Sequence, residues 1–212
     1  MNINPGDIAI PFAVFLFSTT IHEASHAWVA WKWGDPTAKD LGRLTLNPIP
    51  HIDLLGTLIL PLATLIMTSG AGIMGWASTP VDKSKMRDPR WGDFWTSAAG
   101  PISNMILAVI SFILLKVVLH SALGEALGDL GKPVRFMLWT GVWLNIFLMI
   151  LNLLPIPPLD GSHLLQNLLP DSLAEMYEQV RPFGLILLIA VGSSGLLNKL
   201  VEPVIQWVGS ML

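Results

Sequence analysis

IAIPFAVFLFSTTIHEASHAWVAWKW, residues 8–33, is the stretch that decides the fold. Its first fourteen residues carry no charge, and its length suits a helix that crosses a hydrocarbon core of about 30 Å. Three tryptophans and a lysine between residues 28 and 33 mark the C-terminal end as one that lies at a membrane interface. The stretch therefore predicts a membrane-spanning helix, although the HEASH segment at 22–26 contains ionisable groups that a passive anchor would avoid.

The HEASH segment has the HExxH spacing. His22 and His26 are four residues apart, so both imidazoles lie on one face of the helix and can bind one zinc ion. Glu23 lies beside them, where it can take a proton from a zinc-bound water. The alternatives are a chance match and a polar patch for helix packing. Each ionisable residue at mid-membrane costs about 2.5–3.5 kcal/mol, and a shared metal gives all three a reason to be there.

A catalytic zinc site usually has three protein ligands and one open position, so a third ligand is expected elsewhere. The chain has no cysteine, which excludes thiolate ligands and disulfides. Asp160 is the strongest candidate, because it lies just past an apolar span in the proline-rich break NLLPIPPLDGSH, residues 152–163. Irregular backbone at membrane depth is tolerated only against protein or a watery cavity. The alternative for Asp160 is a helix N-cap.

Further apolar stretches follow the first one. Phe94–Leu119, with one charge, and Phe136–Leu154, with none, each predict a span. Phe183–Val208 is interrupted by GSSG and is either one bent span or two shorter helices. Before it, Asp171–Arg181 predicts a short surface helix.

The region after the first span is irregular. Residues 34–53 contain three prolines and two glycines, which exclude a regular helix, and Gly42–Asn47 predicts a short extended or β-hairpin insertion. Leu54–Met67 is apolar but contains Pro61 and ends at the breaker cluster TSGAG. A run this short more often re-enters the membrane than spans it, although the uncharged stretch continues to Val81 and leaves a full crossing open.

Basic residues flank the doubtful segment on both sides. Lys32, Lys39 and Arg43 precede it, and residues 82–93 carry four more lysines and arginines. The positive-inside rule places all of them in the cytoplasm if the segment dips in and returns. We therefore expect four spans, an outside N-terminus and a re-entrant Leu54 region.

Composition agrees with a polytopic membrane protein. Residues are 52% hydrophobic and 13% charged, against about 25% charged in an average soluble domain. The net charge of −3 gives no case for nucleic-acid binding. The N-terminus lacks a basic region typical of a cleaved signal peptide, so we expect the first span to remain in the mature protein. No repeat or linker divides the chain, which predicts one membrane domain, residues 1–212.

The chain resembles the site-2 protease family of intramembrane metalloproteases, peptidase family M50. The resemblance rests on HEASH at 22–26 and NLLPIPPLDG at 152–161, and AAGPISN at 98–104 looks like a third family signature. TLNPIPHID at 45–53 and GWASTPV at 75–81 also look like family segments, although the latter lacks a lysine common there. No stretch of these 212 residues resembles the PDZ or CBS domain of several relatives, so we expect a short form of the family.

The resemblance implies roles for five residues of this chain. His22, His26 and Asp160 would bind zinc (Zn²⁺), and Glu23 would be the general base. Asn152 would position the substrate or stabilise the oxyanion.

These observations predict an all-α polytopic membrane protein of about four to six transmembrane helices. The expected activity is that of an intramembrane zinc metalloprotease, a hydrolase that cuts peptide bonds of membrane-anchored protein substrates with a zinc-activated water. The expected location is a prokaryotic cell membrane, with the active site towards the cytoplasmic half. One rival is a metal transporter, which would show several ligand sets along a pore, and another is a catalytically idle adaptor. The substrate and the oligomeric state stay open.

Overall fold

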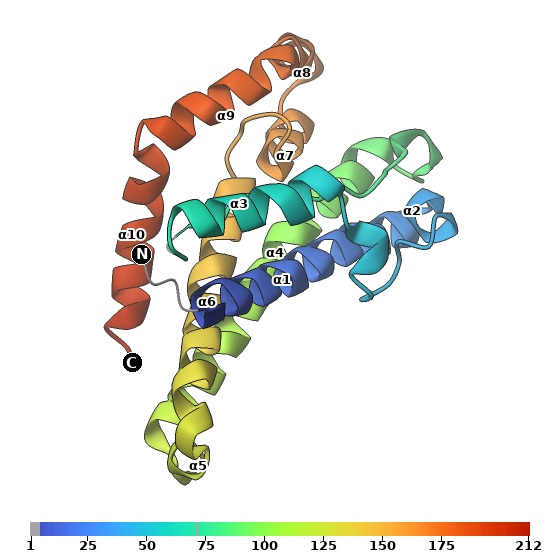
Figure 1. The fold of residues 1–212 in the computed structure, drawn as a ribbon. Helices are drawn as coiled ribbons and strands as arrows, with labels where there is room; N and C mark the ends of the chain where they lie inside the picture. The colour runs from blue at the N-terminus through green and yellow to red at the C-terminus, as the bar shows by residue number, and fades with distance from the viewer. Residues whose placement is uncertain (1–4, 71) are drawn as a thin grey trace.

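The computed structural model describes residues 5–70 and 72–212, and every regular element within them is helical (Figure 1). The longer helices are α1 (Pro5–Trp33), α3 (Leu60–Met67), α4 (Pro89–His120), α6 (Gly131–Asn152), α7 (Asp160–Leu168), α8 (Asp171–Glu178), α9 (Gly184–Ser193) and α10 (Leu196–Gly209). Short helical segments connect them: α2 (Thr37–Asp40), η1 (Ile49–His51), η2 (Leu54–Ile59), η3 (Lys83–Lys85), α5 (Ala122–Ala126), η4 (Gly128–Leu130) and η5 (Arg181–Phe183).

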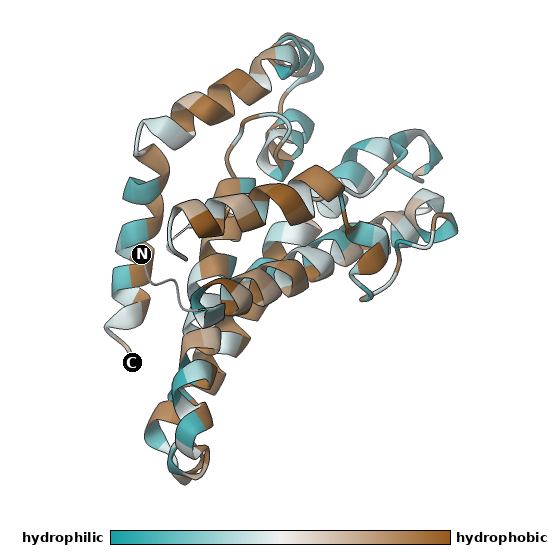
Figure 2. Ribbon diagram, in the orientation of Figure 1, coloured by the Kyte–Doolittle hydropathy of each residue, from teal (hydrophilic) through white to brown (hydrophobic). Residues whose placement is uncertain are grey.

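Three of the described helices are long and apolar enough to cross a membrane: α1, α4, and η4 with α6 as Gly128–Asn152. A fourth crossing is possible by length and composition if Asp171–Ser193 and Leu196–Gly209 act as one span, although they meet at a bend of 57°. The bend lies at Gly195, whose φ of 71° suits glycine. Figure 2 shows mainly apolar residues along α3 and α9, and polar residues around α2 and α8, where the chain turns.

Aspartate side chains cap the start of α4 and of η2. The Asp88 side chain accepts hydrogen bonds from the backbone of Arg90 and Trp91 at 3.0 and 3.1 Å, and Pro89 occupies the first turn of α4. Asp53 caps η2 in the same way, with bonds of 3.1 Å to Leu55 N and 2.6 Å to Gly56 N.

Helices α1, α4 and α6 pack against one another and form the centre of the molecule. One apolar cluster joins Phe15 of α1 to Leu144 and Leu148 of α6 and to Leu65 of α3. A second cluster joins α4 and α6 and is covered by α10, which lies along α6 (Figure 1). This packing leaves α9 with four exposed apolar side chains, at Leu185, Ile186, Leu187 and Ile189.

The Leu54 segment does not continue as a long helix. It forms fourteen helical residues, Leu54–Met67, and then turns at Gly70, where a Cβ atom would lie 2.5 Å from the backbone oxygen of Asp7. The segment has therefore reached the N-terminal end of α1 when it turns. Residues 72–82, hereafter the arm, leave this turn without helical structure.

The arm runs back along α1 towards its C-terminal end. Asp82 N donates a 2.7 Å hydrogen bond to the Asp35 carboxylate, and Arg87 N donates one of 2.9 Å to Trp33 O. The chain that leaves α1 after Trp33 thus comes back to that end of α1 at Asp82 and Arg87.

The β-hairpin expected within Gly42–Asn47 is not found, because the described residues contain no strand. Local side-chain bonds take its place: Asn47 N donates to Thr45 Oγ1, and Ile49 N donates to Asn47 Oδ1, each at 3.1 Å. Such bonds satisfy backbone donors that a ladder would use. Pro48 and Pro50 have no N–H to offer a partner strand.

Candidate metal centre

Helix α1 presents His22 and His26 on one face, as the four-residue spacing predicts. Their ring centroids lie 4.6 Å apart, and each residue is only 7% exposed. The small residues at the head of α4 allow this burial. A Cβ atom at Gly100 would lie 2.5 Å from Nε2 of both histidines, so α4 approaches the imidazoles as closely as a glycine allows.

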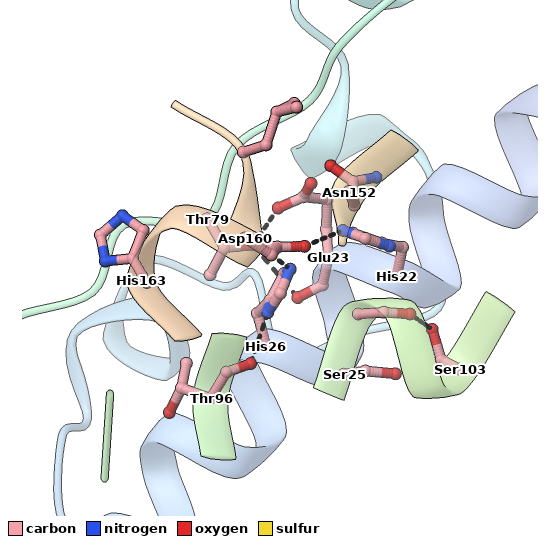
Figure 3. A network of polar contacts seen from close by, with 12 residues as sticks. His22, Glu23, Ser25, His26, Thr79, Thr96, Ser103, Asn152, Asp160 and His163 are labelled. Carbon is pink, nitrogen blue, oxygen red and sulfur yellow. Dashed lines mark hydrogen bonds and ion pairs between the residues drawn. The ribbon is translucent and has the colours of Figure 1, made fainter. Parts of the chain in front are cut away.

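Asp160 reaches the two histidines from α7. Its Oδ2 lies 3.2 Å from His22 Nε2, and its Oδ1 lies 3.4 Å from His26 Nε2 (Figure 3). The ligand atoms of the three residues all lie within 4.8 Å of one another. The next residue, Gly161, allows the close approach, because a Cβ atom there would collide with the carbonyl groups of Leu153 and Leu154.

A chain of buried amides orients His22. Asn145 Nδ2 donates a 2.8 Å hydrogen bond to Gly141 O, and a carbonyl oxygen can only accept, so this bond fixes which end of the Asn145 amide is the nitrogen. The other end, Asn145 Oδ1, therefore accepts a 2.9 Å hydrogen bond from Asn104 Nδ2. Asn104 then turns its Oδ1 to His22 Nδ1, 2.6 Å away. His22 therefore carries its proton on Nδ1 and directs the lone pair of Nε2 at Asp160.

His26 is oriented in the same way by a backbone carbonyl. Its Nδ1 lies 2.7 Å from Thr96 O, which can only accept a hydrogen bond. The neutral imidazole therefore has its proton on Nδ1, and its Nε2 is an acceptor that faces Asp160. The same arrangement, a ring N–H donated to a carbonyl, holds metal-ligating histidines in proteins.

Three acceptors thus converge on one point. Asp160 Oδ2 is buried and has no hydrogen-bond partner among the described residues, although His22 Nε2 is close. Two imidazole lone pairs and a carboxylate repel one another unless a cation lies between them. A proton on one imidazole would satisfy one contact, whereas a metal ion satisfies all three at once. Two nitrogens and a carboxylate oxygen match the donor set of a catalytic zinc site.

Glu23 is buried beside this centre, at 5% exposure, and Figure 3 shows it next to Asp160. Its Oε2 accepts a 2.6 Å hydrogen bond from the hydroxyl of Thr79, which lies on the arm. Asn152 is in the last turn of α6, and Figure 3 places its side chain on the Glu23 side of the centre. Its Nδ2 donates a 3.0 Å hydrogen bond to Leu148 O. Within the described residues, Asn152 makes no hydrogen bond to His22, His26 or Asp160.

Helix α7, which carries Asp160, is held against α4 by polar contacts. The buried Asp93 carboxylate lies 2.8 Å from Lys83 Nζ, 2.5 Å from Asn167 Nδ2 and 3.4 Å from His163 Nδ1. Arg90 adds bonds of 2.7 and 2.8 Å to the carbonyl groups of Asn167 and Leu169, where α7 ends. Cations suit the C-terminal end of a helix.

The sequence points to the five candidate site residues, but their contacts with Asn104, Thr79 and Asp93 were not expected. For Asn104, the signal was an amide inside an apolar span, which needs a partner there. For Asp93, it was a carboxylate at the start of such a span. Thr79 gave no signal, because its partner is fifty-six positions away in the chain.

Comparison with known proteins gives the family. The profile of peptidase family M50 matches residues 11–191. YwhC of Bacillus subtilis, named as a zinc metalloprotease, is 38% identical over 202 residues, which cover 93% of this chain and 87% of that protein.

Two further relatives are mycobacterial. Rip2 of Mycobacterium tuberculosis strain H37Rv, also named as a zinc metalloprotease, is 30% identical over 206 residues, 95% of this chain and 73% of that protein. Rip2 of Mycolicibacterium smegmatis is 28% identical over 213 residues, with the same two coverages. No solved structure matches the chain. The chain belongs to peptidase family M50, the site-2 protease family, and is a membrane zinc metalloprotease.

Proposed function

We propose that His22, His26 and Asp160 bind a single zinc ion, and that this centre hydrolyses peptide bonds of membrane-anchored proteins. The observation that carries the proposal is the convergence of His22 Nε2, His26 Nε2 and the Asp160 carboxylate, whose buried Oδ2 has no hydrogen-bond partner in the described part of the chain. Among the described residues, this is the one group of three such side chains close enough to share a metal. A transporter would need several such groups along its path.

A zinc ion held by these residues would act as a Lewis acid: it would lower the pKa of a bound water molecule to about 7 and polarise the carbonyl group of the peptide bond to be cut. Glu23 is the general base: it takes the proton from the attacking water and returns it to the leaving amine. Its burial and its bond to Thr79 keep the carboxylate in place beside the ligands. Asn152 has a second amide hydrogen besides the one given to Leu148 O, and this hydrogen can stabilise the oxyanion.

We further propose that the substrate binds as an extended strand. A transmembrane helix hides its peptide bonds in internal hydrogen bonds, so it must unwind before attack. Two non-helical segments lie near the site: the arm and residues 42–48. Arg43 connects them, because its Nη1 donates 2.5 Å to Ser78 O. Strand addition to such a segment supplies main-chain hydrogen bonds without demanding one side-chain sequence.

The proposed topology has an outside N-terminus and a re-entrant segment from Leu54 to the end of the arm. Its support is that Asp82, at the end of the arm, bonds to Asp35 and that Arg87 bonds to Trp33 at the C-terminal end of α1. The basic residues before and after the segment then share the cytoplasmic side. His22, His26 and Asp160 lie in the cytoplasmic half of the membrane, and the single domain comprises residues 1–212.

Cysteine labelling tests this topology, because the native chain has no cysteine. Asp40→Cys and Ser84→Cys, both at exposed positions, should stay unlabelled by an impermeant thiol reagent added outside intact cells. Asp129→Cys, in the connector before α6, should be labelled. Permeabilised cells should show labelling of all three. Labelling of Ser84→Cys but not of Asp40→Cys in intact cells would mean that the segment crosses the membrane.

The amide chain behind His22 gives a second prediction. Asn104→Leu removes the partner of the His22 Nδ1–H and of the Asn145 Oδ1. We expect zinc affinity to fall about 10–100-fold, which is typical when the group that orients a ligating histidine is removed. Competition with a chelator measures the affinity. Asn167→Leu, an equal exchange on α7, serves as a comparison, and an affinity loss confined to that variant would contradict the role of Asn104.

The experiment that tests the function as a whole combines metal analysis of the purified protein with cleavage of a generic membrane-anchored reporter. One zinc per chain together with cleavage supports the proposal. Zinc transport into vesicles without cleavage would overturn it.

A further inference from the structure

The arm has the geometry of an extended chain laid along α1. Exposure alternates from residue to residue: Met74, Trp76 and Ser78 are exposed, whereas Ile73, Gly75, Ala77 and Thr79 are buried or half-buried. A period of two is that of a β-conformation, in which successive side chains point to opposite faces. Every second residue from Ile73 to Thr79 therefore faces the protein, and Thr79 belongs to this inward set.

The register of the arm along α1 is set by two contacts. Gly75 lies against Phe15, because a Cβ atom there would be 2.6 Å from the Phe15 ring, and Thr79 lies against Glu23. From Phe15 to Glu23 is eight helical residues, or about 12 Å. From Gly75 to Thr79 is four extended residues, or about 13 Å. The two rises match, so the arm brings the Thr79 hydroxyl to Glu23 without slack.

Hydrogen bonds hold the arm on both sides of Thr79. Before it, Trp76 N donates 2.9 Å to Gly56 O. After it, Asp82 N donates 2.7 Å to Asp35 Oδ2, which is buried at 1% exposure. A shift of the arm by one residue would break both bonds and turn Thr79 away from α1.

The Thr79 hydroxyl has one hydrogen to donate, and two acceptors of Glu23 lie within reach of it. Glu23 Oε2 lies 2.6 Å away and Glu23 O lies 3.1 Å away, so the carboxylate takes the stronger bond. This bond holds one carboxylate oxygen and leaves the other for proton transfer. We infer that Thr79 is a positioning residue for Glu23, an inference that rests on the proposed role of Glu23 as general base.

The expected effect follows from the precision that proton transfer requires. Without the hydroxyl, the Glu23 side chain can adopt other rotamers, and a displacement of about 1 Å can reduce a rate by about a hundredfold. Substrate binding should not change, because Thr79 contributes its side chain to Glu23. The loss should therefore fall on kcat and leave KM and zinc content unchanged.

Thr79→Val and Thr79→Ser provide the test in the full-length protein, with cleavage of a membrane-anchored reporter as the assay. Valine has the shape of threonine without the hydroxyl, whereas serine keeps the hydroxyl. We expect Thr79→Val to lower kcat about 10–100-fold with one zinc per chain and an unchanged KM. Thr79→Ser should recover most of the lost rate. Failure of serine to do so, or a loss confined to KM, would overturn the inference.

Two further variants separate the possible explanations. Thr68→Val removes another hydrogen-bonded hydroxyl, which accepts 2.9 Å from Gly72 N at the far end of the arm. If Thr68→Val lowers kcat as much as Thr79→Val, the effect comes from loosening of the whole arm, and the specific role of Thr79 is overturned. If Thr79→Val has the kcat of the wild type while Glu23→Gln is inactive, the inference about Thr79 is overturned and the proposed function stands. An active Glu23→Gln overturns the proposed function with it.

Discussion

Glu23→Gln is expected to keep one zinc per chain and to lose peptide cleavage by about 10²–10⁴-fold, the usual contribution of a general base. Glutamine has the size of glutamate and can still accept the bond from Thr79, so the surrounding contacts survive. It has no carboxylate to receive the proton of the attacking water. Zinc content should not change, because Glu23 is not among the three converging ligands.

The measurement is a single-turnover cleavage rate together with metal analysis of the same preparation. Single-turnover conditions separate the chemical step from product release. Cleavage at a rate near that of the wild type would show that Glu23 is not the base. Loss of zinc in the same variant would instead assign Glu23 to the metal.

His22→Ala and His26→Ala are each expected to abolish stoichiometric zinc binding and cleavage. Each variant leaves two protein ligands where a catalytic zinc site has three. The His22 variant also removes the partner of the buried Asn104 Oδ1, which is His22 Nδ1 at 2.6 Å. Asp160→Asn tests the third ligand with little change in volume and should weaken zinc binding as well.

His120→Ala is the matched control, because this histidine lies at the exposed end of α4 and contacts Leu212 O. It should retain one zinc per chain and full activity. Metal analysis by mass spectrometry after dialysis measures the difference. Full retention of zinc in both His22→Ala and His26→Ala would disprove the proposed centre.

The spans follow from sequence because burial in lipid imposes a local rule. A membrane-spanning helix must be apolar over about twenty residues, and that pattern is visible without any knowledge of its neighbours. The expectation of spans at Phe94–Leu119 and Phe136–Leu154 agrees with α4 and α6 within a few residues. The helix expected at Asp171–Arg181 is found at Asp171–Glu178.

The irregular parts were harder to predict because their structure depends on distant partners. The Gly42–Asn47 region contains no hairpin, since its backbone donors bond to neighbouring side chains and Arg43 bonds to Ser78. The arm contains no regular element at all, and its extended path is set by contacts with Phe15 and Glu23. Neither set of contacts leaves a periodic trace in the sequence.

Sequence alone pointed to the residues of the proposed centre: the HExxH spacing places His22 and His26 on one helix face, and the break after an apolar span marks Asp160. Only the tertiary structure decided that Asp160 meets both histidines, that Asn104 and Thr96 orient them, and that Thr79 reaches Glu23. The physical reason is range. Helical spacing is a property of neighbouring residues, whereas these contacts form when α4, α7 and the arm pack against α1.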